Sequence, residues 1–264
     1  MSDFFQSVLE NADYFVLLLF RMAALVVSSP LFGRVHVPNT VKVGFAVSLG
    51  VFAFIFFPPV QPVVYGSLVG FVMAILGEVL IGVVLAFVTN MFFSLTFIGG
   101  QMIDMQIGFG IVNVYDQQNN TQVPMVGNLL NIILLLVFWG VDGHHRMIDI
   151  LFLTLRRFPV GSVAMSADAG LAAAELFSKA FTLGVMVALP VIASGLIIEF
   201  GFGALMRTVP QLNMFVVGMP VKLLIGMLML LVTIPVFTRF SSTIFSEMFD
   251  GVERMFSVFY STAV

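Results

Sequence analysis

The chain has 264 residues, of which 60% are hydrophobic and only 9% are charged. A soluble domain carries about 25% charged residues, so this composition excludes one and predicts an integral membrane protein. The net charge of −3 argues against a nucleic-acid partner, and the lack of cysteine excludes disulfides and cysteine-based metal or redox sites.

The first hydrophobic segment is predicted over residues 14–32. Asp3 and Glu10 precede it where a cleavable signal would need basic residues, so we expect the mature protein to keep this segment. Arg21 interrupts it at about +2.5 to +3.5 kcal/mol. About a dozen apolar residues at roughly −0.3 to −0.6 kcal/mol each offset that cost, so the segment remains a candidate span.

Two apolar runs follow before residue 100. The first covers residues 43–57 and ends at Pro58-Pro59, which cannot continue a helix. The second begins at residue 63 and continues through Glu78 to residue 99 without a turn signal other than glycines. At about 1.5 Å per residue it exceeds the roughly 30 Å of a bilayer core, so we expect two helices or one long, broken helix.

A polar stretch rich in amides and aspartates, residues 101–122, separates this run from the next apolar one. Irregular chain at membrane depth is tolerated only where protein buries it or where it lines a water-filled cavity. We therefore predict a loop over about 101–124 that faces protein or water.

The second half of the sequence continues with four helical predictions. They are an apolar run over 126–141, a short amphipathic helix over 147–155, and apolar runs over 169–198 and 221–240. A polar turn is expected between the last two runs. The tail, about 241–264, alternates Phe and Met with charged residues and predicts an amphipathic helix at an interface. The whole is an all-α, polytopic protein of about six hydrophobic segments in one membrane domain, 1–264.

Several charged residues interrupt the apolar runs, where each is costly in lipid. Pairing with one another or with a neighbouring subunit is the favoured interpretation. The alternative is a proton or ion relay through Glu78, Asp104 and Glu199. The set consists of Arg21, Glu78, Glu175, Lys179, Glu199, Arg207, Lys222 and Arg239.

The sequence does not support a motif for catalysis, cofactor binding or metal binding. His144-His145 has only Asp142 and Asp149 nearby, so a solvated loop is favoured over a metal site. The glycines around Phe109 lack the third glycine and the strand of a dinucleotide fingerprint. We therefore predict a protein that is not an enzyme and binds no cofactor or metal.

Two blocks of the sequence resemble the FliR family of flagellar export proteins. The first is GQMIDMQIGFG at 100–110 with Asp116, and the second is RTVPQLNMFVVGMPVK at 207–222. Length, the pattern of spans and the Pro58-Pro59 break agree too, so the resemblance covers nearly the whole chain. Gln117 departs from the family, in which a proline is expected there, and this concerns only the local loop conformation.

The resemblance implies a core subunit of the flagellar type III export gate, in the bacterial inner membrane and the flagellar basal body. Family members join FliP and FliQ in a helical hetero-oligomer, are contacted by FlhB, and have helices that form bent hairpins. Unfolded rod, hook and filament subunits would cross the pore, with membrane lipid around it. The alternatives are a virulence type III secretion subunit and, less favoured, an ion-coupled secondary transporter, which should show two related halves.

The resemblance also gives the polar stretch a role as a movable closure of the pore. Gly108 and Gly110 leave the backbone free on both sides of Phe109, whose ring would plug the lumen. The alternative is a structural turn with Phe109 buried against a neighbour. Supplementary gate residues would be Met105, Ile107 and Ile111, and loop anchors would be Asp104, Gln106, Asn113 and Asp116.

The second block is predicted to serve assembly. Pro210 and Pro220 would bracket a non-helical corner, and Lys222 would pair with a buried acid on a partner subunit. Gln211 and Asn213 would satisfy backbone groups of the corner. The other residues assigned to this assembly motif are Arg207, Phe215 and Gly218.

Overall fold

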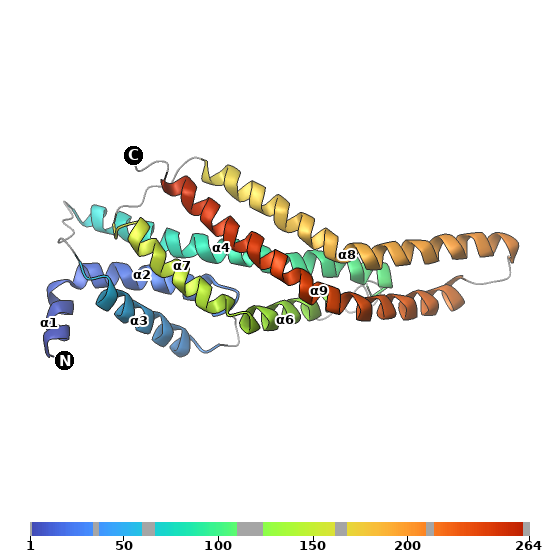
Figure 1. The fold of residues 1–264 in the computed structure, drawn as a ribbon, viewed down its shortest axis with the longest axis horizontal. Coiled ribbons are helices and arrows are strands. Elements are labelled where there is room, and N and C mark those ends of the chain that lie inside the picture. Colours follow the sequence, from blue (N-terminus) through green and yellow to red (C-terminus); the bar gives the residue numbers. More distant parts are fainter. Residues whose placement is uncertain are drawn as a thin grey trace. The chain divides into compact units, whose positions relative to one another are not determined.

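A computed structural model describes residues 2–33, 37–59, 67–109, 124–161, 168–209 and 214–260. Every regular element in these ranges is an α-helix (Figure 1). The helices are α1 (Ser2–Glu10), α2 (Ala12–Ser28), α3 (Asn39–Phe56), α4 (Leu68–Ile107), α6 (Met125–Gly140), α7 (Gly143–Arg157), α8 (Ala169–Thr208) and α9 (Met214–Tyr260).

Four of the helices in the described ranges are long and apolar enough to cross a membrane. They are α3, α4, α8 and, over Val216–Val258, α9. Helices α6 and α7 give a fifth candidate if they count together as one broken span. The predicted all-α, polytopic membrane protein is confirmed.

The helix ends predicted near residues 57, 141 and 157 were confirmed, whereas other predicted breaks were wrong. Helix α4 runs without interruption for 40 residues, about 60 Å, and includes residues 101–107 of the predicted loop. Helix α9 contains Pro220, which therefore does not bound a corner, and it continues through the predicted separate tail. Interior glycines and prolines mark helix ends only when packing does not stabilise the helix on both sides of them.

One compact unit comprises Met1–Asn90, Asp142–Leu176 and Met248–Val264. In it α2 packs along α3 (Figure 1). Gly50 of α3 permits this contact, because a Cβ there would lie 2.6 Å from Cδ2 of Leu19. Gly82 of α4 similarly faces the backbone of α2, with a Cβ 2.5 Å from the carbonyl oxygen of Arg21. Small residues thus set the helix spacing.

The second compact unit comprises Met91–Val141 and Phe177–Glu247. It contains the later part of α4, all of α6, and most of α8 and α9. Aromatic rings fill part of its interior: Phe138 of α6 meets Phe93 at 5.6 Å and Phe245 at 5.1 Å between ring centroids, both edge to face.

The predicted amphipathic pattern of the tail is present in the last turns of α9. Ile244, Met248 and Val252 are buried, whereas Asp250 and Glu253 are exposed. The apolar stripe is covered by the protein itself, and the location of this helix at an interface stays a prediction. A three-to-four-residue period indicates a buried stripe but does not say what buries it.

Candidate functional site

The C-terminal turns of α4, which lead into the predicted gate loop, lie in backbone contact with α8. A Cβ on Gly99 would lie 2.6 Å from the carbonyl oxygen of Gly184, and a Cβ on Gly184 would lie 2.9 Å from the carbonyl oxygen of Leu95. Only glycine permits such an approach at both positions. The end of α4 therefore has one fixed position against α8.

Helix α6 approaches α4 as closely on another side. A Cβ on Gly100 would overlap the backbone of Gly127. Further along the contact, the Asn131 side-chain amide donates to Oγ1 of Thr96 at 3.2 Å. Both side chains are buried. Asn131 and Thr96 were not among the predicted site residues, although a buried amide within an apolar run needs a polar partner.

Asp104 links α4 to the start of α6. Its side chain is fully buried, and Oδ1 accepts a hydrogen bond of 3.2 Å from the N–H of Val126. An acidic group is stabilised at a helix N-terminus, where backbone N–H groups lack helical partners. Oδ2 has no hydrogen-bond partner among the described residues. Asp104 thus connects the two described segments that flank positions 110–123.

Gln106 and Ile107 occupy gaps left by glycines of the opposing helices. Gly195 of α8 faces the Gln106 amide, and Gly226 of α9 faces Ile107, where a Cβ would lie 2.7 Å from Cγ1. Ile107 is 2% exposed, whereas Met105 is 65% exposed. The structure describes two of the supplementary gate residues, both on α4. Of these, only Met105 therefore has a side chain exposed to a pore or a partner.

Helix α4 ends in a conformation that favours glycine. Gly108 has φ of +103° and donates its N–H to the carbonyl oxygen of Asp104 at 3.1 Å. Phe109 follows and is half-buried. The predicted gate and anchor residues Gly110, Ile111, Asn113 and Asp116 lie outside the described residues.

Two ion pairs join α8 to α9 with opposite polarity. Lys179 donates to Glu247 at 2.6 Å, and further along the hairpin Lys222 donates to Glu199. The basic residue is on α8 in the first pair and on α9 in the second. A shift of one helix along the other would separate both pairs, so the charges help to select one antiparallel register.

The assembly motif is only partly described. Arg207 is exposed in the last turn of α8, Gly218 is buried, and Pro220 is exposed on α9. Lys222, which we expected to pair with an acid on a partner subunit, has Glu199 of its own chain as partner. Phe215 lies in α9, but its side chain is outside the described set, as are Pro210, Gln211 and Asn213.

Comparison with known proteins assigns the family. The model of "Bacterial export proteins, family 1" matches residues 12–248. Flagellar biosynthetic protein FliR of Bacillus subtilis (strain 168) is 31% identical over 258 residues, 96% of this chain and 98% of that protein. The chain belongs to the FliR family of bacterial export proteins. FliR of Escherichia coli (strain K12) is 30% identical over 232 residues, 88% of each chain, and FliR of Pectobacterium carotovorum is 31% identical over 230 residues, 87% of each.

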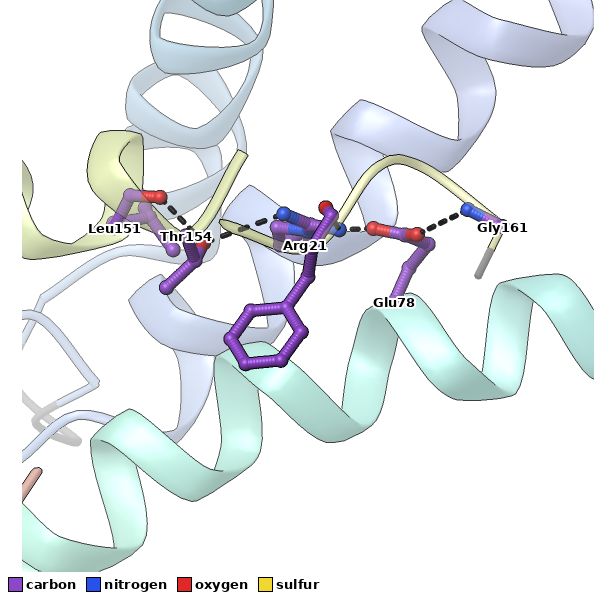
Figure 2. A network of polar contacts seen from close by, with 6 residues as sticks. Arg21, Glu78, Leu151, Thr154 and Gly161 are labelled. Atoms are coloured by element: carbon purple, nitrogen blue, oxygen red, sulfur yellow. Dashed lines mark hydrogen bonds and ion pairs between the residues drawn. The ribbon is translucent and has the colours of Figure 1, made fainter. Parts of the chain in front are cut away.

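A buried ion pair organises the other unit of the FliR-family chain (Figure 2). Arg21 and Glu78 are both 0% exposed, and Nε of Arg21 lies 2.5 Å from Oε2 of Glu78. Arg21 also donates to Oγ1 of Thr154 at 3.3 Å and to the carbonyl oxygen of Phe158 at 3.1 Å. The second Glu78 oxygen accepts the N–H of Gly161 at 2.8 Å. The network ties α2, α4 and the end of α7 together.

These contacts favour pairing over the proposed relay for most of the intramembrane charges. Arg21 and Glu78 pair with each other, and Glu199 pairs with Lys222. Asp104 has no basic partner among the described residues.

The histidine pair comes near one aspartate in the structure. Ligand atoms of Asp142, His144 and His145 all lie within 4.8 Å of one another. Nδ1 of His145 is 3.0 Å from Oδ1 of Asp142, and both side chains are largely exposed. The Asp142–His145 contact also explains this grouping as the hydrogen-bonded start of α7. The absence of a metal site therefore stays a prediction.

Proposed function

We propose that this FliR-family chain is a core subunit of the flagellar type III export gate. It would lie in the bacterial inner membrane within the flagellar basal body and act without enzymatic activity. FliP and FliQ would be its assembly partners, FlhB would contact it, and unfolded rod, hook and filament subunits would cross the pore. The observation that carries this proposal is the family match over residues 12–248 together with relatives aligned along almost the full chain.

The end of α4 would act as a fixed base for a movable closure. Gly99 and Gly100 place α4 in backbone contact with α8 and α6. Ile107 then packs against α9 at Gly226, so three helices hold the last turns. In the proposed closure, movement would begin after residue 107, at Gly108 with its positive φ.

Phe109 would supply the closing group. It is half-buried within its own chain, so part of the ring remains available to a pore or a neighbouring subunit. An apolar ring in a narrow pore blocks ions by excluding water. Met105, 65% exposed, would add apolar surface beside it, whereas Ile107 would act by packing.

Asp104 and Gln106 would anchor the closing loop. Asp104 already binds the N–H of Val126, two residues after the described chain resumes at Pro124. Oδ2 of Asp104 and Nε2 of Gln106 are buried and have no partner among the described residues. Buried polar groups are almost always hydrogen-bonded, so both atoms are suited to hold polar groups of the loop or of a partner subunit.

The assembly motif would present the α8–α9 hairpin to the partner subunits. The internal Glu199–Lys222 pair would fix the hairpin register, and Arg207 would remain exposed for an acidic partner. The exposed apolar residues of α9 from Val216 to Val236 would contact other subunits or lipid.

Co-purification tests membership of the gate. The tagged full-length chain, co-expressed with FliP and FliQ, should yield one particle with fixed stoichiometry. A chain that purifies alone and transports a solute in vesicles would instead favour a secondary transporter and refute the proposal.

Ion leakage tests the closure. In the assembled complex Phe109→Ala should raise membrane conductance, whereas Phe20→Ala, at an exposed ring of α2, should leave it unchanged. Wild-type conductance of a fully assembled Phe109→Ala complex would show that Phe109 does not close the pore.

A further inference from the structure

A cavity of about 450 Å³ lies between the C-terminal end of α3 and α7. Apolar side chains form most of its wall, and a single arginine, Arg156, provides the charge. Among the described residues none of those lining it is acidic. The lining residues are Leu49, Phe52, Phe56, Phe57, Ile148, Phe152 and Arg156.

The aromatic wall of the cavity is held in place by contacts within the chain. The Tyr14 hydroxyl donates to the carbonyl oxygen of Phe57 at 2.9 Å, which fixes the backbone where α3 ends. The Phe57 ring stacks on Phe152 with 6.2 Å between centroids and 13° between planes. Leu49 is 6% exposed and forms the floor. The cavity therefore belongs to the packed fold and has a size typical of small-molecule sites.

The Arg156 guanidinium is available to bind an anion. Its Cζ lies 5.6 Å from the centroid of the Phe57 ring, and the side chain is exposed in the last turn of α7. Contact of a guanidinium with a ring uses the flat face and leaves the N–H groups in its plane able to bind oxygen atoms. No acidic side chain forms an ion pair with Arg156 in the described part of the chain.

The surroundings of the cavity favour an amphiphilic ligand. Helix α3 is a candidate membrane span, and the cavity lies at its C-terminal end, where Phe52 and Phe56 are 55% and 71% exposed. A ligand that fits must combine an apolar chain for the phenylalanine wall with an anionic oxygen group for the arginine. Arginine pairs with phosphate through two parallel hydrogen bonds, and basic pockets beside membrane helices bind anionic lipid headgroups.

We propose that this cavity binds one anionic glycerophospholipid, with its phosphate on Arg156 and part of an acyl chain against Phe52, Phe57 and Phe152. The bound lipid would join α3 to α7 at the membrane surface. The site is independent of the closing loop and of the proposed export function.

The test uses the purified full-length chain with an equal mixture of palmitoyl-oleoyl phosphatidylglycerol and phosphatidylcholine. Native mass spectrometry counts the lipids retained per chain. The wild type should retain phosphatidylglycerol in preference, and Arg156→Gln should lower that retention about tenfold or more, because charged hydrogen bonds are lost. Equal retention of the two lipids, or no effect of Arg156→Gln, would overturn the proposal.

Arg146 provides a matched control on the same helix. Its Cζ also lies over a phenylalanine ring, 4.2 Å from the Phe249 centroid, but it does not line the cavity. Arg146→Gln removes the same charge and should retain lipid as the wild type does. An equal loss in Arg146→Gln would assign binding to general surface charge and refute a specific site.

Two further measurements test the apolar part. Ile148→Trp should fill the cavity and reduce retention of phosphatidylglycerol even though Arg156 remains, and unchanged retention would count against an acyl chain there. A photoreactive phenylalanine analogue at Phe52 should crosslink to lipid in cell membranes. Crosslinks to another protein at that position would assign the cavity to a protein partner and overturn the lipid proposal.

Discussion

Removal of one member of the buried Arg21–Glu78 pair should destabilise the protein far more than removal of both. Glu78→Met leaves the Arg21 guanidinium, 0% exposed, without its counter-charge. Loss of one partner of a buried pair costs about 3–5 kcal/mol, because the remaining charge stays buried and uncompensated. Arg21→Met should cost a similar amount, since it leaves the Glu78 carboxylate in the same position. Methionine is of similar length to both side chains, so the cavity left behind is small.

The double variant Arg21→Met/Glu78→Met removes both charges at once. Replacing a buried pair with apolar residues is often neutral or stabilising by about 1–4 kcal/mol. Against this, the carbonyl oxygen of Phe158 and the N–H of Gly161 lose their partners, at about 1–3 kcal/mol each. The double variant should therefore cost between about −2 and +6 kcal/mol, less than the roughly 6–10 kcal/mol sum of the single changes.

A double-mutant cycle measures this coupling. Unfolding of the full-length chain in mixed micelles of mild detergent and dodecyl sulfate, followed by circular dichroism, gives the free energies. Arg239→Met, at an exposed position of α9, serves as control and should stay within about 0.5 kcal/mol of wild type. A double variant whose cost equals the sum of the single costs would show that the two charges do not stabilise each other.

Three further predictions concern the second unit. Gly100→Ala should prevent α4 from contacting the α6 backbone and abolish folding or assembly, as judged by monodispersity after purification. Gly201→Ala serves as control and should purify as wild type, because a Cβ there meets nothing within 4 Å. Gly108→Ala places a side chain at φ of +103° and should cost about 1–2 kcal/mol, and an unchanged free energy of unfolding would contradict the strain. Glu199→Lys and Lys222→Glu should each weaken the α8–α9 hairpin, which would be measured as faster cleavage by a protease. The double charge swap should restore wild-type protease resistance, and failure to restore it would show that the pair has no role in register.

The positions of most helices could be predicted from the sequence because hydrophobic runs and prolines act locally. Pro58-Pro59 follow the end of α3 at Phe56, and the predicted apolar runs lie largely within α4, α6, α8 and α9, although α8 and α9 extend beyond them. The breaks could not be predicted in this way. Glycines in α4 and Pro220 in α9 weaken an isolated helix, but contacts with other helices decide whether the helix continues.

The residues of the candidate site also fall into two groups, those selected from the sequence and those whose contacts only the fold shows. Phe109 between two glycines and Asp104 were selected from the sequence together with the family motif, and their roles in a closure stay predictions. The contacts of Ile107 and Lys222 could not be predicted, because Gly226 and Glu199 lie far from them in sequence and only folding brings them into contact.

An all-α membrane protein with charged residues in apolar runs can be predicted without the structure, since composition and the cost of charge in lipid need no knowledge of contacts. The two motifs of the FliR family are likewise local in sequence. In contrast, the folded structure is needed to show which charges pair, where glycines bring backbones together, and which side of each helix stays exposed. These are properties of residues distant in sequence, and they depend on the distances at which the helices pack.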